Sequence, residues 1–480
     1  MPEWENKTLD DDFELNGHWW IPGQEDKALP GVLTRKAGNS NLTLFGAFSS
    51  FYELGTIKRL NPPGPLPIIL GRATDGTKIT LYKARLTSNI TPFGGSTATG
   101  EEKYHPSYVF IGGHYENPEQ LTFVSMSISI TNIETWVGYY PIPRFLERDK
   151  ADPRKILIQG RAMDDIVFPI PSIGSTLALI GDVSYKGNAL KKGTLTQVMR
   201  FELIPEKPQS FDWFTDQRYY LLQFITFLMG IPAFNRNLHF AGVERDNGYG
   251  DTTNDELSVF YDPARSITNP SETVSDLDML LPFGNLAGRF GEFVAAWFAN
   301  KGRFDDVWAL FFGTVYNRSF SLEYRFSRLA NCLECYSRMM DLPPSKSSGI
   351  FAVPKGWKHF TRSMNLPTVP GSKKKISLRQ RLLAILHSLQ LETVRLISST
   401  PEVLCAKLVK ARDYHSHYAE EMKGDDLTGT PMFVFCERLH ILIVILLLKS
   451  IGIDEADIRV IIENNQRIMM IRHSYFDNDM

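Results

Sequence analysis

The sequence has few cysteines, no long apolar run and almost no net charge. Four cysteines in 480 residues do not make the disulfide framework of a small secreted protein, and they fit a reducing compartment. The longest apolar run, Ile441–Leu448, is shorter than the roughly 18 residues that a transmembrane helix needs, so we expect a buried bundle helix or a dimer face there. The first residues lack the basic and apolar segments of a signal peptide. We therefore expect a cytoplasmic protein with no membrane partner.

The balance of charge excludes a generally basic protein. The 52 basic and 54 acidic residues leave a net charge of −2, so any surface that binds nucleic acid must be a local patch. The apolar content of 43% is ordinary for a globular protein, and the length predicts two or three domains.

Patterns typical of metal and phosphate sites are also missing. Cys332 and Cys335 form one Cys-x-x-Cys pair, with no second pair or nearby histidine to complete a zinc site, so we interpret them as buried structural cysteines. The glycine-rich stretch Pro92–Ser96 lacks the lysine of a phosphate loop. The histidines of the first half have no ligand spacing: His18, His105 and His114. We expect no metal and no cofactor.

The first half of the chain, residues 1–205, predicts an antiparallel sandwich or open barrel. Val124–Ile130 alternates apolar and polar residues strictly, as a half-buried strand does. The clearest β-patterned runs are Leu42–Phe48, Lys78–Leu86, Leu121–Thr131, Ser175–Tyr185 and Leu195–Ile204. Many short strands between turns are typical of such all-β architectures.

The pattern changes toward the C-terminus. Residues 206–282 predict a helix at Phe211–Met229 and two strands, and this part either completes the first domain or connects it to the next. Residues 283–480 show helical periodicity, interrupted by a loop insertion at 341–375. The expected fold class is α+β, an N-terminal antiparallel β-sandwich-like domain followed by a C-terminal α-helical bundle.

The candidate site lies on a late helix of this bundle. Metal-free RNA cleavage needs a base for the 2′-hydroxyl, positive charge at the phosphorane and an acid for the leaving 5′-oxygen. Arg412 supplies a permanent, forked cation, and His417 supplies a group that transfers protons near neutral pH. Asp413 can orient either of them, and Tyr418 can bond a phosphate or stack on a base.

The spacing of Arg412 and His417 limits this hypothesis. Five residues separate the two positions by about 140° around a helix, so they converge at a helix edge or across a two-fold axis. His415 lies closer to the face of Arg412 and is a rival for the catalytic role. On spacing alone, Arg412 and His417 are more often ordinary solvent-exposed residues at a helix end than catalytic residues.

A basic run precedes the motif helix. It has no acidic residue and either binds RNA phosphates or forms a solvated loop. Its members are Lys373, Lys374, Lys375, Arg379 and Arg381.

The stretch Arg412–His417, set in a helical bundle, resembles the Arg-(Asp/Asn)-x-x-x-His motif of the HEPN superfamily, whose active members are metal-independent ribonucleases. The resemblance implies a homodimer through the bundle, in which Arg412 and His417 form a composite site. It also implies products that end in a 2′,3′-cyclic phosphate and a 5′-hydroxyl.

The first half resembles the N-terminal domain of ApeA-like anti-phage proteins. The resemblance rests on residues 16–22, 30–33, 42–46, 69–71, 75–81 and 132–136. It implies cleavage of RNA, possibly tRNA, that arrests translation on infection, with the β domain as a sensor of a phage-derived trigger or as an inhibitor. Two alternatives remain: an inactive HEPN dimerisation module, and a carbohydrate- or ligand-binding β-sandwich joined to helices that only oligomerise.

Overall fold

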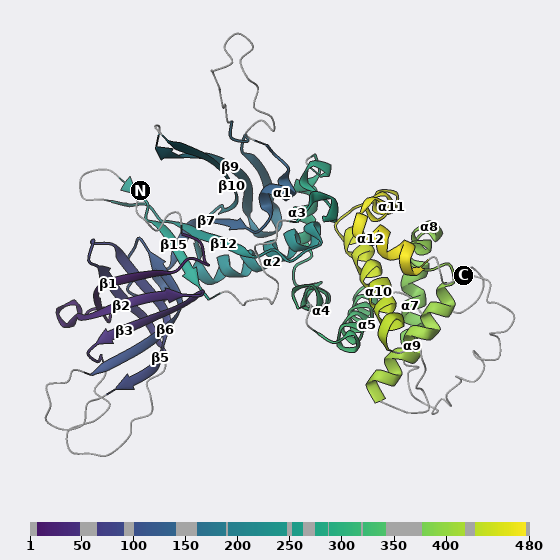
Figure 1. The fold of residues 1–480 in the computed structure, drawn as a ribbon, viewed down its shortest axis with the longest axis horizontal. Coiled ribbons are helices and arrows are strands. Elements are labelled where there is room, and N and C mark those ends of the chain that lie inside the picture. The colour runs from purple at the N-terminus through teal and green to yellow at the C-terminus, as the bar shows by residue number, and fades with distance from the viewer. Residues whose placement is uncertain are drawn as a thin grey trace, which may run out of the picture. The chain divides into compact units, whose positions relative to one another are not determined.

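The computed structural model divides into two compact units, which Figure 1 colours from purple to teal and from green to yellow. The first consists mainly of Met1–Ile225 and Ala233–Arg265, and the second mainly of Val274–Met480. The structure describes residues 7–48, 65–90, 100–140, 161–188, 191–246, 252–262, 274–286, 288–317, 320–341, 377–417 and 428–476.

The first unit begins with a closed barrel. Its strands are β1 (Phe13–Trp20), β2 (Leu29–Lys36), β3 (Asn39–Phe45), β4 (Leu66–Ala73), β5 (Lys78–Ile90) and β6 (Glu101–Ile111). They pair in the order β3-β2-β1-β4-β5-β6, and the pairing of β3 with β6 closes the ring. Alternate side chains fill the interior, among them Trp19, Leu33, Leu42, Ile79 and Leu81.

The sheet continues beyond the barrel because β6 has two partners on one edge. Its first half pairs with β3, and its second half pairs with β15 (Glu256–Tyr261). From there the order is β12 (Asn235–Gly242), β7 (Thr122–Ile130), β10 (Lys192–Pro205), β9 (Ser175–Asn188) and β8 (Ile166–Ile170). The smaller elements are α1 (Ile133–Val137), β11 (Gln209–Ser210), β13 (Arg245–Asp246) and β14 (Thr252–Thr253).

The predicted α+β class is confirmed, and the antiparallel first part forms a barrel with further strands. Alternation predicts which residues face a core, but a sandwich and a barrel share that pattern. The helix α2 (Phe211–Met229) has the bounds that its apolar run and the following Gly230 predict. The division between the two units falls inside α2, after Ile225.

The second unit is helical, as predicted. Its helices are α3 (Phe290–Ala299), α4 (Asp305–Tyr316), α5 (Leu322–Met339), α7 (Leu378–His387), α8 (Leu391–Arg395), α9 (Pro401–His417), α10 (Gly429–Ser450), α11 (Glu455–Asn464) and α12 (Gln466–Ile471). Ser377, three residues before Gln380, predicts a capping box, and that box is present at the start of α7. The loop predicted at 341–375 lies, apart from Asp341, outside the described residues.

The helical periodicity over Asp454–Ile471 predicts one continuous helix, but the structure has two, α11 and α12. Asn465 leaves the helical conformation and separates α11 from α12. Its side chain accepts a hydrogen bond from the Ile468 N–H at 2.9 Å and donates one to the Met279 carbonyl at 3.1 Å. An asparagine that caps the next helix and bonds a distant carbonyl can offset the lost helical hydrogen bonds.

Within the described residues, α10 is the one helix long and apolar enough to span a membrane. Most of its most apolar stretch, 83%, is buried inside the protein. Ile441–Leu448 is therefore the buried bundle helix that the sequence predicts, and a core role accounts for its composition.

Arg35 of β2 is a fully buried charge in the first unit. Its guanidinium donates hydrogen bonds to the Leu9 carbonyl at 2.6 and 3.2 Å, to the Ser40 hydroxyl at 2.8 Å and to the Tyr261 carbonyl at 3.0 Å. The Asp262 carboxylate lies 3.8 Å away. One side chain thus joins the N-terminal segment, the β2–β3 hairpin and the end of β15.

We expect Arg35→Gln to destabilise the first unit by about 3 kcal/mol, because the shorter side chain leaves the carbonyl groups of Leu9 and Tyr261 without their donor. Calorimetry of the full chain measures the shift of the corresponding transition. Arg72→Gln is the control, since Arg72 is exposed and should change stability by less than about 0.5 kcal/mol. Equal effects of the two substitutions would contradict the role of Arg35.

Candidate active site

The helix α9 presents the motif segment at its C-terminal end. It begins at Pro401, as Thr400, Pro401 and Glu402 predict. One face is buried against α5 and α7, and it contains Leu404, Cys405, Leu408 and Ala411. This packing fixes the rotation of α9 and hence the direction in which each motif position faces.

Arg412 lies at the edge of the buried face and contacts two carboxylates. Its Nη1 is 3.2 Å from Asp413 Oδ1, and its Nη2 is 4.0 Å from Glu334 Oε2 on α5. Arg338, one turn further along α5, holds the other Glu334 oxygen at 2.5 Å. With 35% of its side chain exposed, the Arg412 guanidinium is both oriented by the protein and open to a ligand. A forked cation of this kind suits a phosphate.

His415 faces α5 at another point. Its ring lies 6.3 Å from the ring of Phe326 and 5.0 Å from that of Tyr414, centroid to centroid. It also lies close to Glu323, whose pKa is lowered mainly by its own backbone N–H and the Ser321 hydroxyl and further by His415. Glu334 and Phe326 are eight residues apart on α5, so Arg412 and His415 contact sites about 12 Å apart along that helix.

His417 is the last residue of α9, and its side chain lies outside the described residues, as does Tyr418. Its helical position is about 140° from Arg412 and about 180° from Leu408. Position 417 is therefore on the side of α9 opposite the buried face. The pairing of Arg412 with His417 stays a prediction.

Of the basic run, the structure describes Arg379 and Arg381 only, and it places Arg379 away from Arg412. Lys373, Lys374 and Lys375 lie outside the described residues. Arg379 on α7 acts electrostatically on Glu402 and Cys405, near the start of α9. Glu402 is ten residues before Arg412, which is about 15 Å along the helix. Arg381 belongs to the same N-terminal part of α7.

Of the two cysteines predicted to be buried, Cys332 is buried and Cys335 is not. Cys332 is fully buried, its thiol donates to the Val307 carbonyl at 3.4 Å, and burial raises its pKa. Cys335 is partly exposed. In the parts of the chain that the structure describes, no group of three or more His, Cys, Asp or Glu side chains is placed to hold a metal ion.

Two family models match the chain, one after the other. The model described as ApeA N-terminal domain 1 matches residues 14–297, more than half of the chain. The chain belongs to the ApeA family. The model described as Apea-like HEPN matches residues 328–457, which include Glu334, Arg412 and His417. No curated protein and no solved structure matches the chain. The resemblance that the sequence predicted is confirmed in both parts.

Sequence reasoning missed Glu334 as a neighbour of Arg412, and Arg338 as the second partner of Glu334. The spacing of four residues between Glu334 and Arg338 predicts an ion pair on one helix, and that pair is present. Nothing local indicates that Glu334 also faces a residue 78 positions later in the sequence. This contact arises only when α5 and α9 of the HEPN domain pack together.

A buried ion pair holds α5 against α10 of the same domain. Arg325 Nη1 lies 2.6 Å from Glu437 Oε1, and Glu437 is almost fully buried. Burial alone would raise the pKa of Glu437, but attraction by Arg325, His440 and Arg467 outweighs it and lowers that pKa below its ordinary value. The helix that carries Glu334 is thereby anchored on its opposite side.

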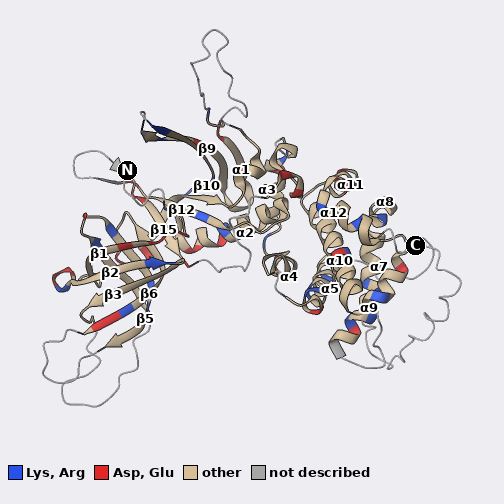
Figure 2. Ribbon diagram, in the orientation of Figure 1, with Lys and Arg blue, Asp and Glu red and all other residues tan. Residues whose placement is uncertain are grey.

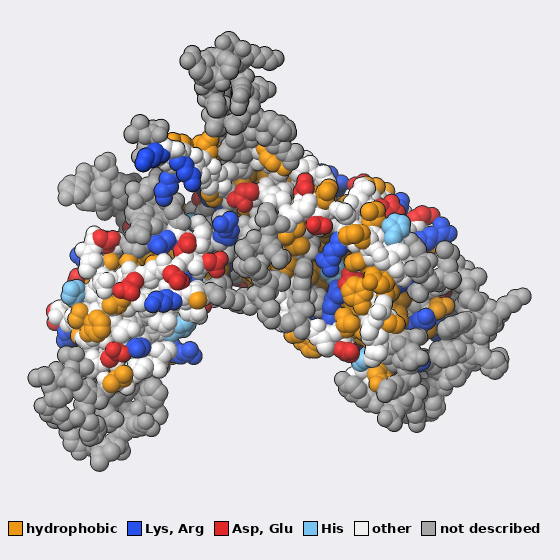
Figure 3. All heavy atoms as spheres, in the orientation of Figure 1, with side chains coloured by type: hydrophobic (Ala, Val, Ile, Leu, Met, Phe, Trp, Pro, Cys, Tyr) orange, Lys and Arg blue, Asp and Glu red, His pale blue; other side chains and the backbone are white. Residues whose placement is uncertain are grey.

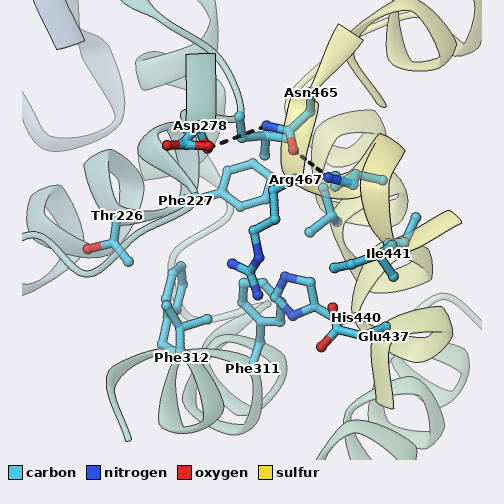
Figure 4. A pocket seen from close by; sticks show the side chains of 16 residues that line it. Thr226, Phe227, Asp278, Phe311, Phe312, Glu437, His440, Ile441, Asn465 and Arg467 are labelled. Carbon is cyan, nitrogen blue, oxygen red and sulfur yellow. Dashed lines mark hydrogen bonds between the residues drawn. The ribbon is translucent and has the colours of Figure 1, made fainter. Parts of the chain in front are cut away.

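A cavity of about 40 Å³ lies beside this ion pair (Figure 4). Arg467 extends into it next to His440, and Phe311 stacks on His440 with ring centroids 5.2 Å apart. A bound water needs roughly 10–15 Å³, so this cavity holds a few water molecules and no nucleotide. The surface around Arg412 remains the better candidate for an RNA site.

We expect Glu437→Gln to lower the stability of the HEPN domain by about 3 kcal/mol at pH 7, since Arg325 loses its buried partner. Because the folded pKa of Glu437 is lowered from 4.5, its stabilisation is complete above that value and is lost as the pH falls through the folded pKa. Thermal unfolding followed by circular dichroism from pH 7 to pH 3 should show this loss in the wild type and not in the variant. Glu292→Gln, at an exposed ion pair, is the control. Equal acid sensitivity of Glu437→Gln and wild type would contradict the assignment.

Proposed function

We propose that this protein is a metal-independent HEPN endoribonuclease of bacterial anti-phage defence, which cleaves RNA, possibly tRNA, and arrests translation on infection. The observation that carries the proposal is the partly exposed Arg412 side chain, whose guanidinium is oriented by Asp413 and Glu334 inside the matched HEPN span. The ApeA match of the first part supports the defence role, with the β domain as sensor of a phage-derived trigger or as inhibitor.

The proposed reaction uses only groups of the chain and the RNA. The 2′-oxygen attacks the adjacent phosphorus while its proton passes to a base. The bond from phosphorus to the 5′-oxygen breaks, and that oxygen takes a proton from an acid. Arg412 binds the scissile phosphate and stabilises the phosphorane, and His417 serves as general acid or base. The products are a 2′,3′-cyclic phosphate and a 5′-hydroxyl.

The helix geometry favours a site shared by two copies. Position 417 lies on the side of α9 away from the bundle, whereas Arg412 is held at the edge next to α5. A homodimer through the HEPN bundle lets Arg412 of one copy meet His417 of the other. His415, packed near Phe326, then orders α9, and Tyr418 contacts the RNA.

One observation favours an inactive dimerisation module as the second candidate function. Arg412 already has two carboxylate partners in its own chain, and His415 packs against an aromatic ring. Both side chains thus have structural roles without any substrate. In that case the HEPN domain would only join two copies of the ligand-binding first part.

Cleavage in EDTA separates these functions. We expect the wild type to cut RNA in the presence of phage-infected cell extract, and Arg412→Ala and His417→Ala each to lower the rate by about 10²–10³-fold. His415→Phe should keep most of the activity because it preserves the contact with Phe326. Arg395→Gln, at an exposed position of α8, is the control. Loss of activity in His415→Phe but not in His417→Ala would transfer the catalytic role to His415, and equal cutting by all variants would overturn the proposal.

Mixed dimers test the shared site. Co-expression of Arg412→Ala and His417→Ala chains should restore about a quarter of the wild-type rate, because half of the dimers then contain one intact Arg412–His417 combination. A site within a single chain would remain inactive in every mixture. The rate of RNA cleavage by the purified mixture, compared with each variant alone, decides between them.

A further inference from the structure

The strands β9 and β10 extend past the sheet as a two-stranded ribbon. The pairing of β8 with β9 covers Ser175–Leu179 only, and that of β7 with β10 covers Phe201–Leu203 only. Beyond these, β9 and β10 pair with each other as far as Asn188 and Lys192. We call residues 183–188 and 191–198 the ribbon; Figure 1 shows β9 and β10 side by side.

Contacts between the two strands of the ribbon stabilise it where no other strand covers it. Gly187 and Gly193 face each other across the strands, and a Cβ on Gly193 would lie 2.5 Å from the ring of Tyr185. The Tyr185 side chain therefore covers the space that Gly193 leaves open. An ion pair of Asp182 with Arg200 closes the base. An isolated two-stranded hairpin is only marginally stable, so these contacts matter for its order.

The charge of the ribbon is entirely positive. Lys186, Lys191 and Lys192 are exposed, and residues 183–198 contain no acidic residue. No hydrogen bond or ion pair joins the three ammonium groups to other residues that the structure describes. Blue colouring gathers at the free end of the two strands in Figure 2, and Figure 3 shows basic side chains on the surface there.

The exposed side chains of the ribbon fit a polyanion better than a protein. Protein interfaces have an apolar centre and few lysines, whereas the large apolar groups exposed here are Tyr185, at 61%, and Val198, at 37%. Lysines bind the phosphates of a nucleic acid whatever its base sequence, and an exposed aromatic ring stacks on unpaired bases. In a chain with a net charge of −2, such a patch is the kind of local surface that RNA binding requires.

We propose that the β9–β10 ribbon binds the phosphate backbone of RNA through Lys186, Lys191 and Lys192, with Tyr185 against a base. The choice of RNA over other polyanions rests on the proposed nuclease function. The contact is sequence-independent and raises affinity, while the choice of the scissile bond belongs to the HEPN domain.

Binding measured without cleavage tests this proposal. The full chain with Arg412→Ala is titrated into fluorescently labelled tRNA and a single-stranded RNA between 50 and 300 mM salt. Adding Lys186→Gln, Lys191→Gln and Lys192→Gln should weaken binding at least about tenfold at low salt and reduce the slope of log K against log salt by about 2. The matched control replaces three exposed lysines of the barrel: Lys27, Lys36 and Lys78. Hydrogen exchange of the ribbon amides verifies that the ribbon remains paired.

The outcomes separate this inference from the nuclease proposal. If the ribbon variant, but not the barrel control, shows weaker RNA binding and a smaller slope of log K against log salt, RNA binding by the ribbon is supported. This holds even if the wild type proves unable to cut RNA. Equal affinity and slope for the ribbon variant and its parent would overturn the inference, even if cleavage is confirmed. The same three lysine substitutions are also made in the wild-type background. If they leave RNA binding normal but cleavage no longer responds to infected-cell extract, the ribbon contacts a protein partner and the inference is overturned.

Discussion

The position of α5 is the constraint on which the candidate site depends. Arg325 pairs with Glu437 of α10, and Glu334 pairs with Arg412 of α9. The two α5 residues are nine positions apart, which places them about 180° apart around the helix. A buried ion pair adds little net stability compared with an apolar contact, because desolvation offsets the attraction. What it contributes is a defined rotation of α5, and with it a defined place for Glu334.

The carboxylates around Arg412 have two opposite effects. They hold the guanidinium in one orientation, which lowers the entropy that a phosphate contact costs. They also neutralise part of the charge that attracts a phosphate. The Glu334 contact at 4.0 Å is long and is shared with Arg338, so a phosphate can replace it at little cost. The Asp413 contact is local and can persist beside a bound RNA, because a guanidinium has five N–H donors.

Local patterns predicted most elements of the fold but few of its long-range contacts. The bounds of α2, the capping box at Ser377 and the start of α9 at Pro401 depend on neighbouring residues. Barrel closure depends on the register between β3 and β6, which no local pattern contains. The break at Asn465 depends on a carbonyl at Met279. For the same reason the motif was visible in the sequence and its partner Glu334 was not.

The ribbon and the Arg412 site differ in how each could attract a phosphate to a chain that has almost no net charge. Opposite charges attract effectively over about 8–10 Å at physiological salt, so a nearly neutral chain cannot attract RNA as a whole. In the proposed division of roles, the ammonium groups of the ribbon, which have no partner among the described residues, bind any phosphate and gain from counterion release. Arg412 is paired and oriented, so it discriminates by geometry instead of by net charge. In the proposed function, affinity from the ribbon and chemistry at Arg412 would together allow a protein with net charge −2 to act on RNA.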